Sequence, residues 1–238
     1  MTGRSEHAVV LQAASVLLQY PDARVRAALP AVRAALEMLP RGLPPRRLLD
    51  LVGYLETTPP GELEERYVAV LDHKRKCCLY LTWWSDGETR RRGLSLARLK
   101  QLYRSRGVEL LPDELPDYLP VVLEFAATAD VELGLQVLQE HRAGLELLRL
   151  ALLEAGTEYV AALEAICALL PGVSPSDEAA ARALARSGPP GELVGLDGYG
   201  GLSDAVGPTS LPSTSPAAAG RGAGGLPFVP LDSLGVRR

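Results

Sequence analysis

The sequence predicts an all-α fold, a single-domain helical bundle with a Gly/Pro-rich tail. Up to about residue 170, apolar residues recur at the i, i+3, i+4, i+7 spacing of a helix face, and no stretch alternates with the two-residue period of a half-buried strand. The chain has 238 residues, 47% of them hydrophobic, which is ample for a buried core. The last 68 residues, however, hold 13 of the 23 glycines and 9 of the 19 prolines. We therefore expect a helical domain over residues 1–171 and a mostly disordered tail over 172–238, with a short helix at 177–186.

Turn-forming residues mark where the helices should end. They gather at 21–22, 40–45, 57–61, 107, 112–116, 130 and 156–157, and seven to nine helices fit between these breaks. Asp22 can cap a helix that runs to Met38. Pro30 lies inside this helix and should bend or interrupt it.

Apolar faces define the helices that follow. One face consists of Leu48, Leu51, Val52 and Leu55, the next of Leu63, Tyr67, Val70 and Leu71, and a third of Leu119, Val122, Leu123 and Ala126. The longest expected helix runs from Val131 to Leu153, and its apolar residues on several faces indicate burial on more than one side. Thr157 can begin a last helix, which should end near Leu170.

The composition argues against several classes of protein. No apolar run approaches the roughly 18 residues that a membrane span requires. The N-terminus lacks the basic and apolar regions of a secretory signal, so we expect a cytoplasmic protein without a membrane span. Cys77, Cys78 and Cys167 should be free thiols, because they form no even disulfide framework. They also show no spacing typical of a metal site, so no metal is expected.

The charge is unevenly distributed, although the net charge is only −4. Residues 72–106 contain ten Lys/Arg and three Asp/Glu, whereas residues 109–132 contain seven Asp/Glu and no Lys/Arg. The two segments can pack side by side and neutralise each other. Alternatively, they form a surface with one basic and one acidic edge that orients a charged partner.

Catalytic patterns are missing from the sequence. It contains no GxxxxGK[ST], HExxH or GxSxG motif, and its histidines have no adjacent nucleophile. We therefore expect no catalytic residue and no cofactor-binding residue. Binding of nucleic acid by the basic segment 74–106 is the alternative function, since clustered Lys and Arg contact phosphates. The acidic overall charge and the acidic segment that follows count against it.

Aromatic and charged residues concentrate in the stretch CCLYLTWWSDGETRRRG, residues 77–93. Charged edges beside an aromatic surface suit a groove that accepts an amphipathic helix of another protein. Trp83 and Trp84 are adjacent, so they cannot both face one core. We expect one of them to anchor the fold, and the other is free to contact a partner.

This stretch lies within a longer one that resembles a known family. The run ERYVAVLDHKRKCCLYLTWWSDGETRRRGLSLARLKQLYRSRGVEL (65–110), followed by DELPDYLPVVLEFAA (113–127), is similar to the central signature of NarJ-type nitrate reductase chaperones, also called the delta subunit. The resemblance covers about residues 11–170 and extends to PPGELVGLDGYG at 189–200.

The resemblance implies both a fold and a function. The fold is the all-helical, single-domain type of the TorD/DmsD group of molybdoenzyme chaperones. The function is non-catalytic: members bind the N-terminal segment of the immature nitrate reductase alpha subunit and keep it competent for insertion of the molybdenum cofactor. Partners would therefore be the apo alpha subunit and proteins that deliver the molybdenum cofactor.

The resemblance also indicates where the client peptide binds. Asp117 matches an Asp that relatives usually follow with His, whereas this chain has Tyr118 at the second position. A phenol can still form hydrogen bonds but lacks the proton-dependent charge of an imidazole. We expect Arg90, Arg91 and Arg92 to form a rim that pairs with acids near Glu124 or with client carboxylates. The candidate client-binding residues are Tyr67, Leu71, Asp72, Arg75, Leu79, Tyr80, Trp83, Arg90, Arg91, Arg92, Asp117, Leu119, Glu124 and Phe125.

Overall fold

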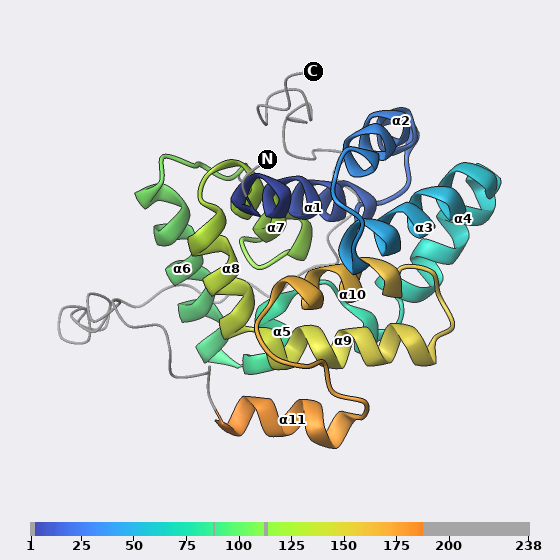
Figure 1. Ribbon diagram of the computed structural model, residues 1–238. Coiled ribbons are helices and arrows are strands. Elements are labelled where there is room, and N and C mark those ends of the chain that lie inside the picture. The colour runs from blue at the N-terminus through green and yellow to red at the C-terminus, as the bar shows by residue number, and fades with distance from the viewer. Residues whose placement is uncertain (1–2, 88, 112–113, 188–238) are drawn as a thin grey trace.

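The fold is all-α over the part of the chain that the structure describes, which confirms the predicted class. The structure is a computed structural model that describes residues 3–87, 89–111 and 114–187 (Figure 1). Its α-helices are α1 (Gly3–Leu17), α2 (Ala23–Glu37), α3 (Leu43–Thr57), α4 (Pro60–Tyr67), α5 (Leu81–Asp86), α6 (Arg90–Ser105), α7 (Leu119–Thr128), α8 (Val131–Glu140), α9 (Arg142–Glu154), α10 (Val160–Leu169) and α11 (Glu178–Ser187). A π-helical turn (Val68–Asp72) and a 3₁₀ turn (Arg75–Cys77) lie between α4 and α5.

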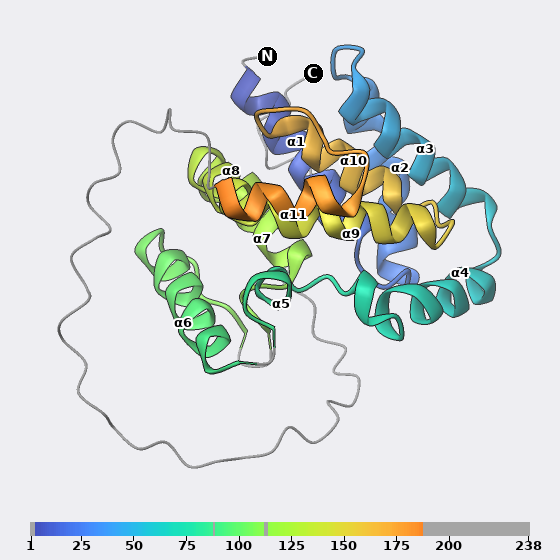
Figure 2. The same ribbon diagram turned by 90° about the horizontal axis from the view of Figure 1, so that it is seen from below.

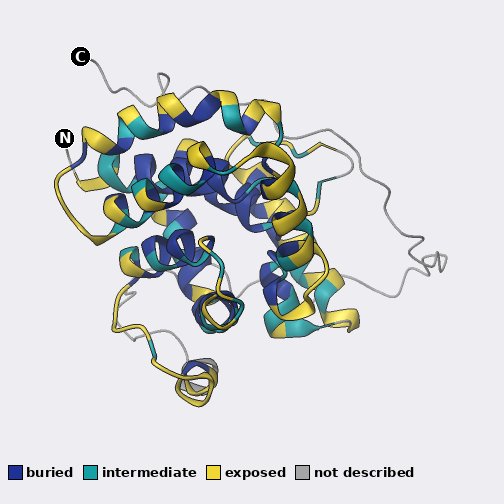
Figure 3. Cartoon of the chain, turned by 90° about the vertical axis from the view of Figure 1, so that its right-hand side faces the viewer, coloured by how far each residue is buried: buried dark blue, intermediate teal, exposed yellow. Residues whose placement is uncertain are grey.

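Two central helices, α1 and α7, carry most of the core. Every residue from Ala8 to Leu17 of α1 is buried, as is every residue from Leu119 to Ala127 of α7. A helix that is apolar on all sides must be covered on all sides. Helix α7 packs directly on α1, while α10 packs on α1, α3 and α9. Buried residues accordingly line the inner faces of the surrounding helices, and exposed residues lie outside (Figure 3).

The start of α2 agrees with the sequence, and the helix continues through Pro30. The Asp22 carboxylate accepts a hydrogen bond of 2.9 Å from the Val25 N–H and caps the helix as expected. Pro30 neither interrupts nor ends α2, which continues to Glu37. Pro30 is exposed, so solvent can satisfy the carbonyl that the missing N–H leaves unpaired.

The predicted long helix from Val131 to Leu153 is wrong, because the chain turns at His141 and forms α8 and α9. The two halves have different neighbours: α8 packs on α7, whereas α9 packs on α10 and α11. At Gly134, α8 approaches α7 so closely that a Cβ there would lie 2.1 Å from the Ala126 Cβ. This contact fixes the direction of α8, and no Pro or Gly in the sequence marks the turn that follows it.

The number of helices is larger than the expected seven to nine. The described residues up to Leu169 form ten α-helices, since the long helix splits and the region around residue 80 forms the short α5. The last helix of the core, α10, begins at Val160, three residues after the expected start at Thr157.

The short helix expected at 177–186 is present as α11, Glu178–Ser187, and it lies along α9 (Figures 1 and 2). A buried ionic network attaches the connecting segment 172–175 to α9. Glu146 is fully buried and pairs with Arg142 and Arg149, which also donate hydrogen bonds to the carbonyl groups of Gly172 and Pro175. The packed body therefore continues past residue 171. The predicted disorder of the remaining tail concerns residues 188–238, which lie outside the described residues.

Candidate functional site

The stretch around residue 80 and the stretch around residue 118 meet in the structure. Tyr80 and Tyr118 form an isolated antiparallel β-bridge. The Leu81 N–H donates to the Asp117 carbonyl at 2.9 Å, and the Leu119 N–H donates to the Leu79 carbonyl at 2.7 Å. This bridge brings together two segments that are far apart in the chain, and it places the starts of α5 and α7 next to each other. We call this region the junction.

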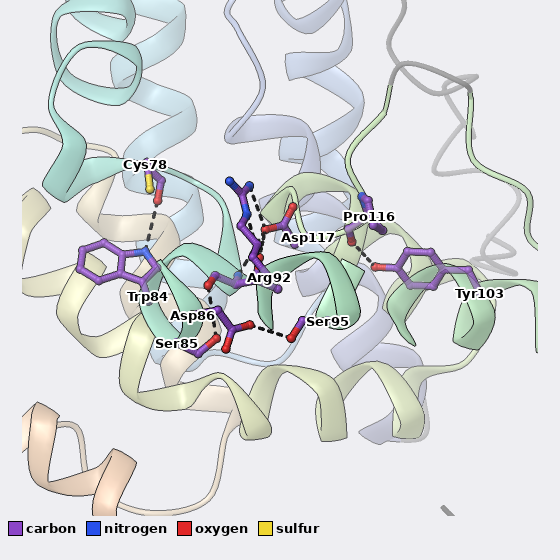
Figure 4. Close-up of polar contacts among 10 residues, drawn as sticks. Cys78, Trp84, Ser85, Asp86, Arg92, Ser95, Tyr103, Pro116 and Asp117 are labelled. Carbon is purple, nitrogen blue, oxygen red and sulfur yellow. Dashed lines mark hydrogen bonds and ion pairs between the residues drawn. The ribbon is translucent and has the colours of Figure 1, made fainter. Parts of the chain in front are cut away.

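A buried carboxylate organises the junction (Figure 4). Asp117 is completely buried, and its Oδ2 accepts hydrogen bonds from the Thr82 N–H and hydroxyl. The same oxygen lies 3.4 Å from Arg92 Nη2, and Arg92 Nε donates to the Thr82 hydroxyl at 3.2 Å. Asp117 thus links the first turn of α6 to the first turn of α5. A charge that is taken out of water in this way is tolerated only when it is paired and hydrogen-bonded.

Three tyrosines of the junction contact one another. The Tyr80 and Tyr118 rings lie 5.5 Å apart, and the Tyr118 hydroxyl is 3.3 Å from that of Tyr67. The Tyr67 hydroxyl also lies 2.9 Å from the Leu18 carbonyl, to which it donates. Burial raises the pKa of Tyr118 to about 12. The Tyr118 phenol is therefore neutral at physiological pH and serves as a hydrogen-bonding group.

Two arginines stack on aromatic rings at the surface of the junction. The Arg92 guanidinium lies 5.7 Å from the centre of the Tyr80 ring, and that of Arg75 lies 5.4 Å from the centre of the Trp83 ring. Asp72 and Arg75 are exposed, whereas Tyr80, Trp83 and Arg92 are half-buried. We call these five residues the junction face. It offers partly exposed aromatic area together with cationic groups.

The two tryptophans have different environments. Trp84 donates from its Nε1 to the Cys78 carbonyl at 3.3 Å (Figure 4) and lies against α9. A Cβ on Gly144 of α9 would be only 2.7 Å from the Trp84 Cβ. Trp84 is thus the tryptophan that anchors the fold, and Trp83 is the one on the junction face.

The structure separates the predicted site residues into a buried set and an accessible set. The buried set comprises Tyr67, Leu71, Leu79, Asp117, Leu119, Glu124 and Phe125. The accessible set comprises Asp72, Arg75, Tyr80, Trp83, Arg90, Arg91 and Arg92. In this conformation the buried residues belong to the core, where α1 covers α7, so they do not line an open groove. Asp117, through its ion pair with Arg92, connects the two sets.

The expected arginine rim is also divided. Arg92 pairs with Asp117, whereas Arg90 and Arg91 are exposed and make no ion pair with another described residue. Glu124, expected to face the rim, lies in the core. Burial, with a smaller contribution from Glu114, raises the pKa of Glu124 to about 7. Of the three arginines, Arg92 has its partner in Asp117.

Among the residues that the structure describes, ion pairs join the basic segment to the acidic one. Arg92 pairs with Asp117, and Arg106 pairs with Asp130 at 3.0 Å. Neutralisation of one segment by the other thus accounts for part of the charge pattern. Most of the cations of α6 form no ion pair with a described residue of the acidic segment.

Sequence reasoning missed Thr82. Thr82 is fully buried and bonds to both Asp117 and Arg92. A signal was present, since a hydroxyl within the apolar stretch LYLTWW must find a partner if it is buried. Which partner it finds depends on a segment 35 residues further along the chain.

The described residues contain no group of three or more His, Cys, Asp or Glu that could hold a metal ion. Desolvation raises the pKa of the Cys77 and Cys78 thiols, which is the opposite of the change that makes a cysteine reactive. Among the same residues, no helix combines the length and the apolar character needed to cross a membrane.

Comparisons with known proteins agree on one family. The family model described as the nitrate reductase delta subunit matches residues 21–165. The nitrate reductase-like protein NarX of Mycobacterium tuberculosis is 39% identical over 159 residues, which are 67% of this chain and 24% of that protein. The chain thus spans about a quarter of the length of this relative.

Shorter relatives are covered more completely. The protein assigned as the nitrate reductase molybdenum cofactor assembly chaperone NarJ in Bacillus subtilis is 33% identical over 181 residues, which are 75% of this chain and 98% of that one. The Escherichia coli chaperone of the same name is 28% identical over 169 residues, covering 70% of this chain and 71% of that one.

A solved structure shares the fold. The crystal structure of a candidate redox enzyme maturation protein from Archaeoglobus fulgidus superposes with a TM-score of 0.52 at 19% identity, covering 71% of this chain and 94% of that one. The family match spans more than half of the sequence and includes every residue of the junction, so the chain belongs to the nitrate reductase delta subunit family.

Proposed function

We propose that this protein is an assembly chaperone for nitrate reductase and has no catalytic activity of its own. Family membership supports this role, because the Bacillus subtilis and Escherichia coli relatives are named as molybdenum cofactor assembly chaperones of nitrate reductase. The raised pKa of the junction thiols is consistent with it, since an enzyme that used Cys77 or Cys78 as a nucleophile would need a lowered one.

The chaperone binds the N-terminal segment of the immature alpha subunit at the junction face. The observation that carries this proposal is the pair of arginine–aromatic stacks, Arg75 on Trp83 and Arg92 on Tyr80, on an otherwise well-packed body. Aromatic rings that keep part of their area in solvent are typical anchors for a partner. Arg92 already donates to Thr82 and pairs with Asp117, so what it adds to the face is a fixed positive charge over the Tyr80 ring.

Contacts beneath the junction face explain how its side chains stay in place without a ligand. Asp117 holds Arg92 through an ion pair, and the β-bridge between Tyr80 and Tyr118 fixes the ring below it. A site that is already ordered loses less conformational entropy when a peptide binds. While bound, the N-terminal segment of the alpha subunit, which we call the leader, would be kept from other contacts until the molybdenum cofactor is inserted. Proteins that deliver the molybdenum cofactor would be further partners of this step. The cytoplasmic location of the protein stays a prediction.

Co-purification tests the binding site. The tagged full-length chain is co-expressed with a fusion carrying the first 40 or so residues of the alpha subunit, and the captured fusion is quantified. We expect Trp83→Ala and Tyr80→Ala each to reduce capture at least about tenfold, the effect of losing one aromatic anchor. Leu153→Ala is the matched control, because Leu153 is 55% exposed and lies beside Arg47 and Val160, outside the five residues of the junction face.

Circular dichroism of each variant separates loss of binding from loss of folding. If Leu153→Ala reduces capture as strongly as Trp83→Ala does, the assignment of the junction face is contradicted. Capture of no fusion by the unchanged protein would contradict leader binding itself.

A further inference from the structure

Helix α6 carries a surface that the junction does not use. The buried residues of α6 are Leu99, Leu102 and Tyr103. On the opposite side, one stripe of exposed residues follows the helix at intervals of three and four: Arg90, Leu94, Ala97, Gln101 and Arg104. We call this stripe the α6 outer face. Leu94, in its first half, is 75% exposed, which is unusual for a leucine in a folded body.

The whole helix is cationic. It contains six Lys/Arg and no Asp/Glu, in a protein whose net charge is −4. Three of these arginines occupy the first turn, where the helix dipole disfavours positive charge. Lys100 and Arg104 are also one turn apart, a like-charged spacing that weakens a helix.

Few of these charges are neutralised within the described part of the chain. Arg92 pairs with Asp117, and Arg98 lies 3.6 Å from Glu140. Arg90, Arg91, Lys100 and Arg104 are exposed and form no ion pair with a described residue. The cations of the outer face thus cost helix stability without gaining an ion pair in the described part of the chain.

A hollow adjoins the second half of the outer face. It measures about 210 Å³ and is lined by Lys100 and Arg104 of α6 and by Val108, Glu109, Leu110 and Leu111 of the following segment. Its walls combine two cationic side chains with apolar area. An acidic side chain next to an apolar one would fit this lining.

We propose that the α6 outer face and this hollow bind an acidic segment of a partner protein, at a place separate from the junction face. Glutamate or aspartate side chains of the segment pair with Arg90 and Arg104, and an apolar residue covers Leu94. In Figure 2, α6 stands at the edge of the molecule, with α5 between it and most of the body, so a partner can reach it. The proposal does not rest on leader binding.

A protein segment fits this surface better than a membrane or a nucleic acid does. Glu109 lines the hollow, and the acidic segment 109–132 begins there, so a long polyanion would meet like charges next to α6. Leu94 is the only large apolar side chain of α6 among the exposed residues of the described chain, too little for insertion into a bilayer.

A synthetic peptide tests the proposal directly. The probe is a fluorescein-labelled 16-residue helical peptide with Glu along one face and one Leu among them, and its partner is the full-length chain. We expect anisotropy to show binding at 50 mM salt that weakens about tenfold at 200 mM. The same peptide with every Glu replaced by Gln should not bind.

Charge-reversal variants locate the site. Arg90→Glu combined with Arg104→Glu should weaken binding of the acidic peptide at least tenfold. The control pair Arg41→Glu and Arg46→Glu changes the net charge equally at exposed positions at and near the start of α3, and it should reduce affinity far less. Trp83→Ala should leave acidic-peptide binding unchanged, which distinguishes this site from the junction face.

Three results would overturn the proposal. The first is that the Glu peptide does not bind at 50 mM salt, and the second is that the two charge-reversal pairs lose equal affinity for it. The third is that a DNA duplex or phosphatidylglycerol vesicles bind more tightly than the peptide at matched anion concentration. The last would assign the outer face to nucleic acid or to lipid instead.

Discussion

Asp117 is the residue on which the junction depends most. Its carboxylate is fully buried and holds both Thr82 and Arg92. Asp117→Asn keeps the shape but removes the charge, and the amide cannot accept from both partners as strongly. We expect the free energy of unfolding to fall by about 2 kcal/mol in urea titrations. Asp50→Asn is the control, since Asp50 is exposed and its pair with Arg47 should contribute less than about 0.5 kcal/mol. Equal losses in the two variants would show that Asp117 is not an organising residue.

Glu124 makes stability depend on pH. Its pKa is raised to about 7 in the folded protein from 4.5, so between these values the folded state binds more protons than the unfolded state. Stability should therefore fall as pH rises from about 4.5 to 7 and level off above, by at most about 3 kcal/mol. Because Glu124→Gln cannot ionise, it should lose this slope and be the more stable protein at pH 8. Chemical unfolding at several pH values measures both curves, and parallel curves would contradict the assignment.

At the scale of the element, α5 is positioned by a contact with α9. The backbone of Gly144 leaves room for Trp84, and an added Cβ would come within 2.7 Å of the Trp84 Cβ. Gly144→Ala should therefore destabilise the protein by about 1–3 kcal/mol, the cost of overpacking, and should shift the tryptophan fluorescence. Gly93→Ala is the matched control in α6, where a Cβ meets nothing within 4 Å. It should be neutral or stabilising, because Ala favours a helix. A stable Gly144→Ala protein with unchanged fluorescence would show that the close contact is not needed.

The attachment of α11 depends on the charge of Glu146. This carboxylate lies between Arg142 and Arg149, and it also accepts a 2.7 Å hydrogen bond from the Ser174 hydroxyl. Glu146→Gln leaves two buried cations without their counterion, at a cost of about 3 kcal/mol. Hydrogen exchange should then accelerate in residues 172–187 more than in α1. If exchange in α11 stays unchanged, apolar packing rather than the ionic network holds it.

Much of the element structure could be predicted because it depends on local patterns. The face with Leu48, Leu51 and Leu55 gave α3, and the Asp22 cap gave the start of α2. The turn at His141 could not be predicted, because no Pro or Gly marks it and the helices on its two sides pack on different neighbours. Propensity carries no information about such distant neighbours.

The environments of the candidate site residues were predictable in part. The composition of residues 77–93 predicts that one tryptophan anchors the fold, and Trp84 does so, whereas partner binding in this region stays a prediction. The accessibility of the other candidates could not be predicted, because Leu119 and Phe125 have the apolar character of a groove lining and yet lie in the core. Apolar residues suit both places, and only the packing of α7 against α1 decides between them.

At the scale of the whole molecule, the structure presents two surfaces of different chemistry. The junction face combines rings with arginines, while the α6 outer face is mostly cationic. Salt should distinguish them: binding at the outer face should weaken steeply between 50 and 200 mM salt, whereas leader binding, if burial drives it, should change little. Titrating each ligand at both salt concentrations makes this comparison, and equal salt dependence would indicate a single shared site.

Leader binding by burial at the junction face is the central claim, and titration calorimetry tests it most directly. The full-length protein is titrated with the first 40 or so residues of the alpha subunit at several temperatures. Burial of about 400 Å² of apolar surface should give micromolar affinity and a heat-capacity change of about −0.2 kcal/mol/K. Both should shrink in Trp83→Ala and persist in Leu153→Ala. A heat-capacity change near zero, or equal affinity in the two variants, would contradict the claim.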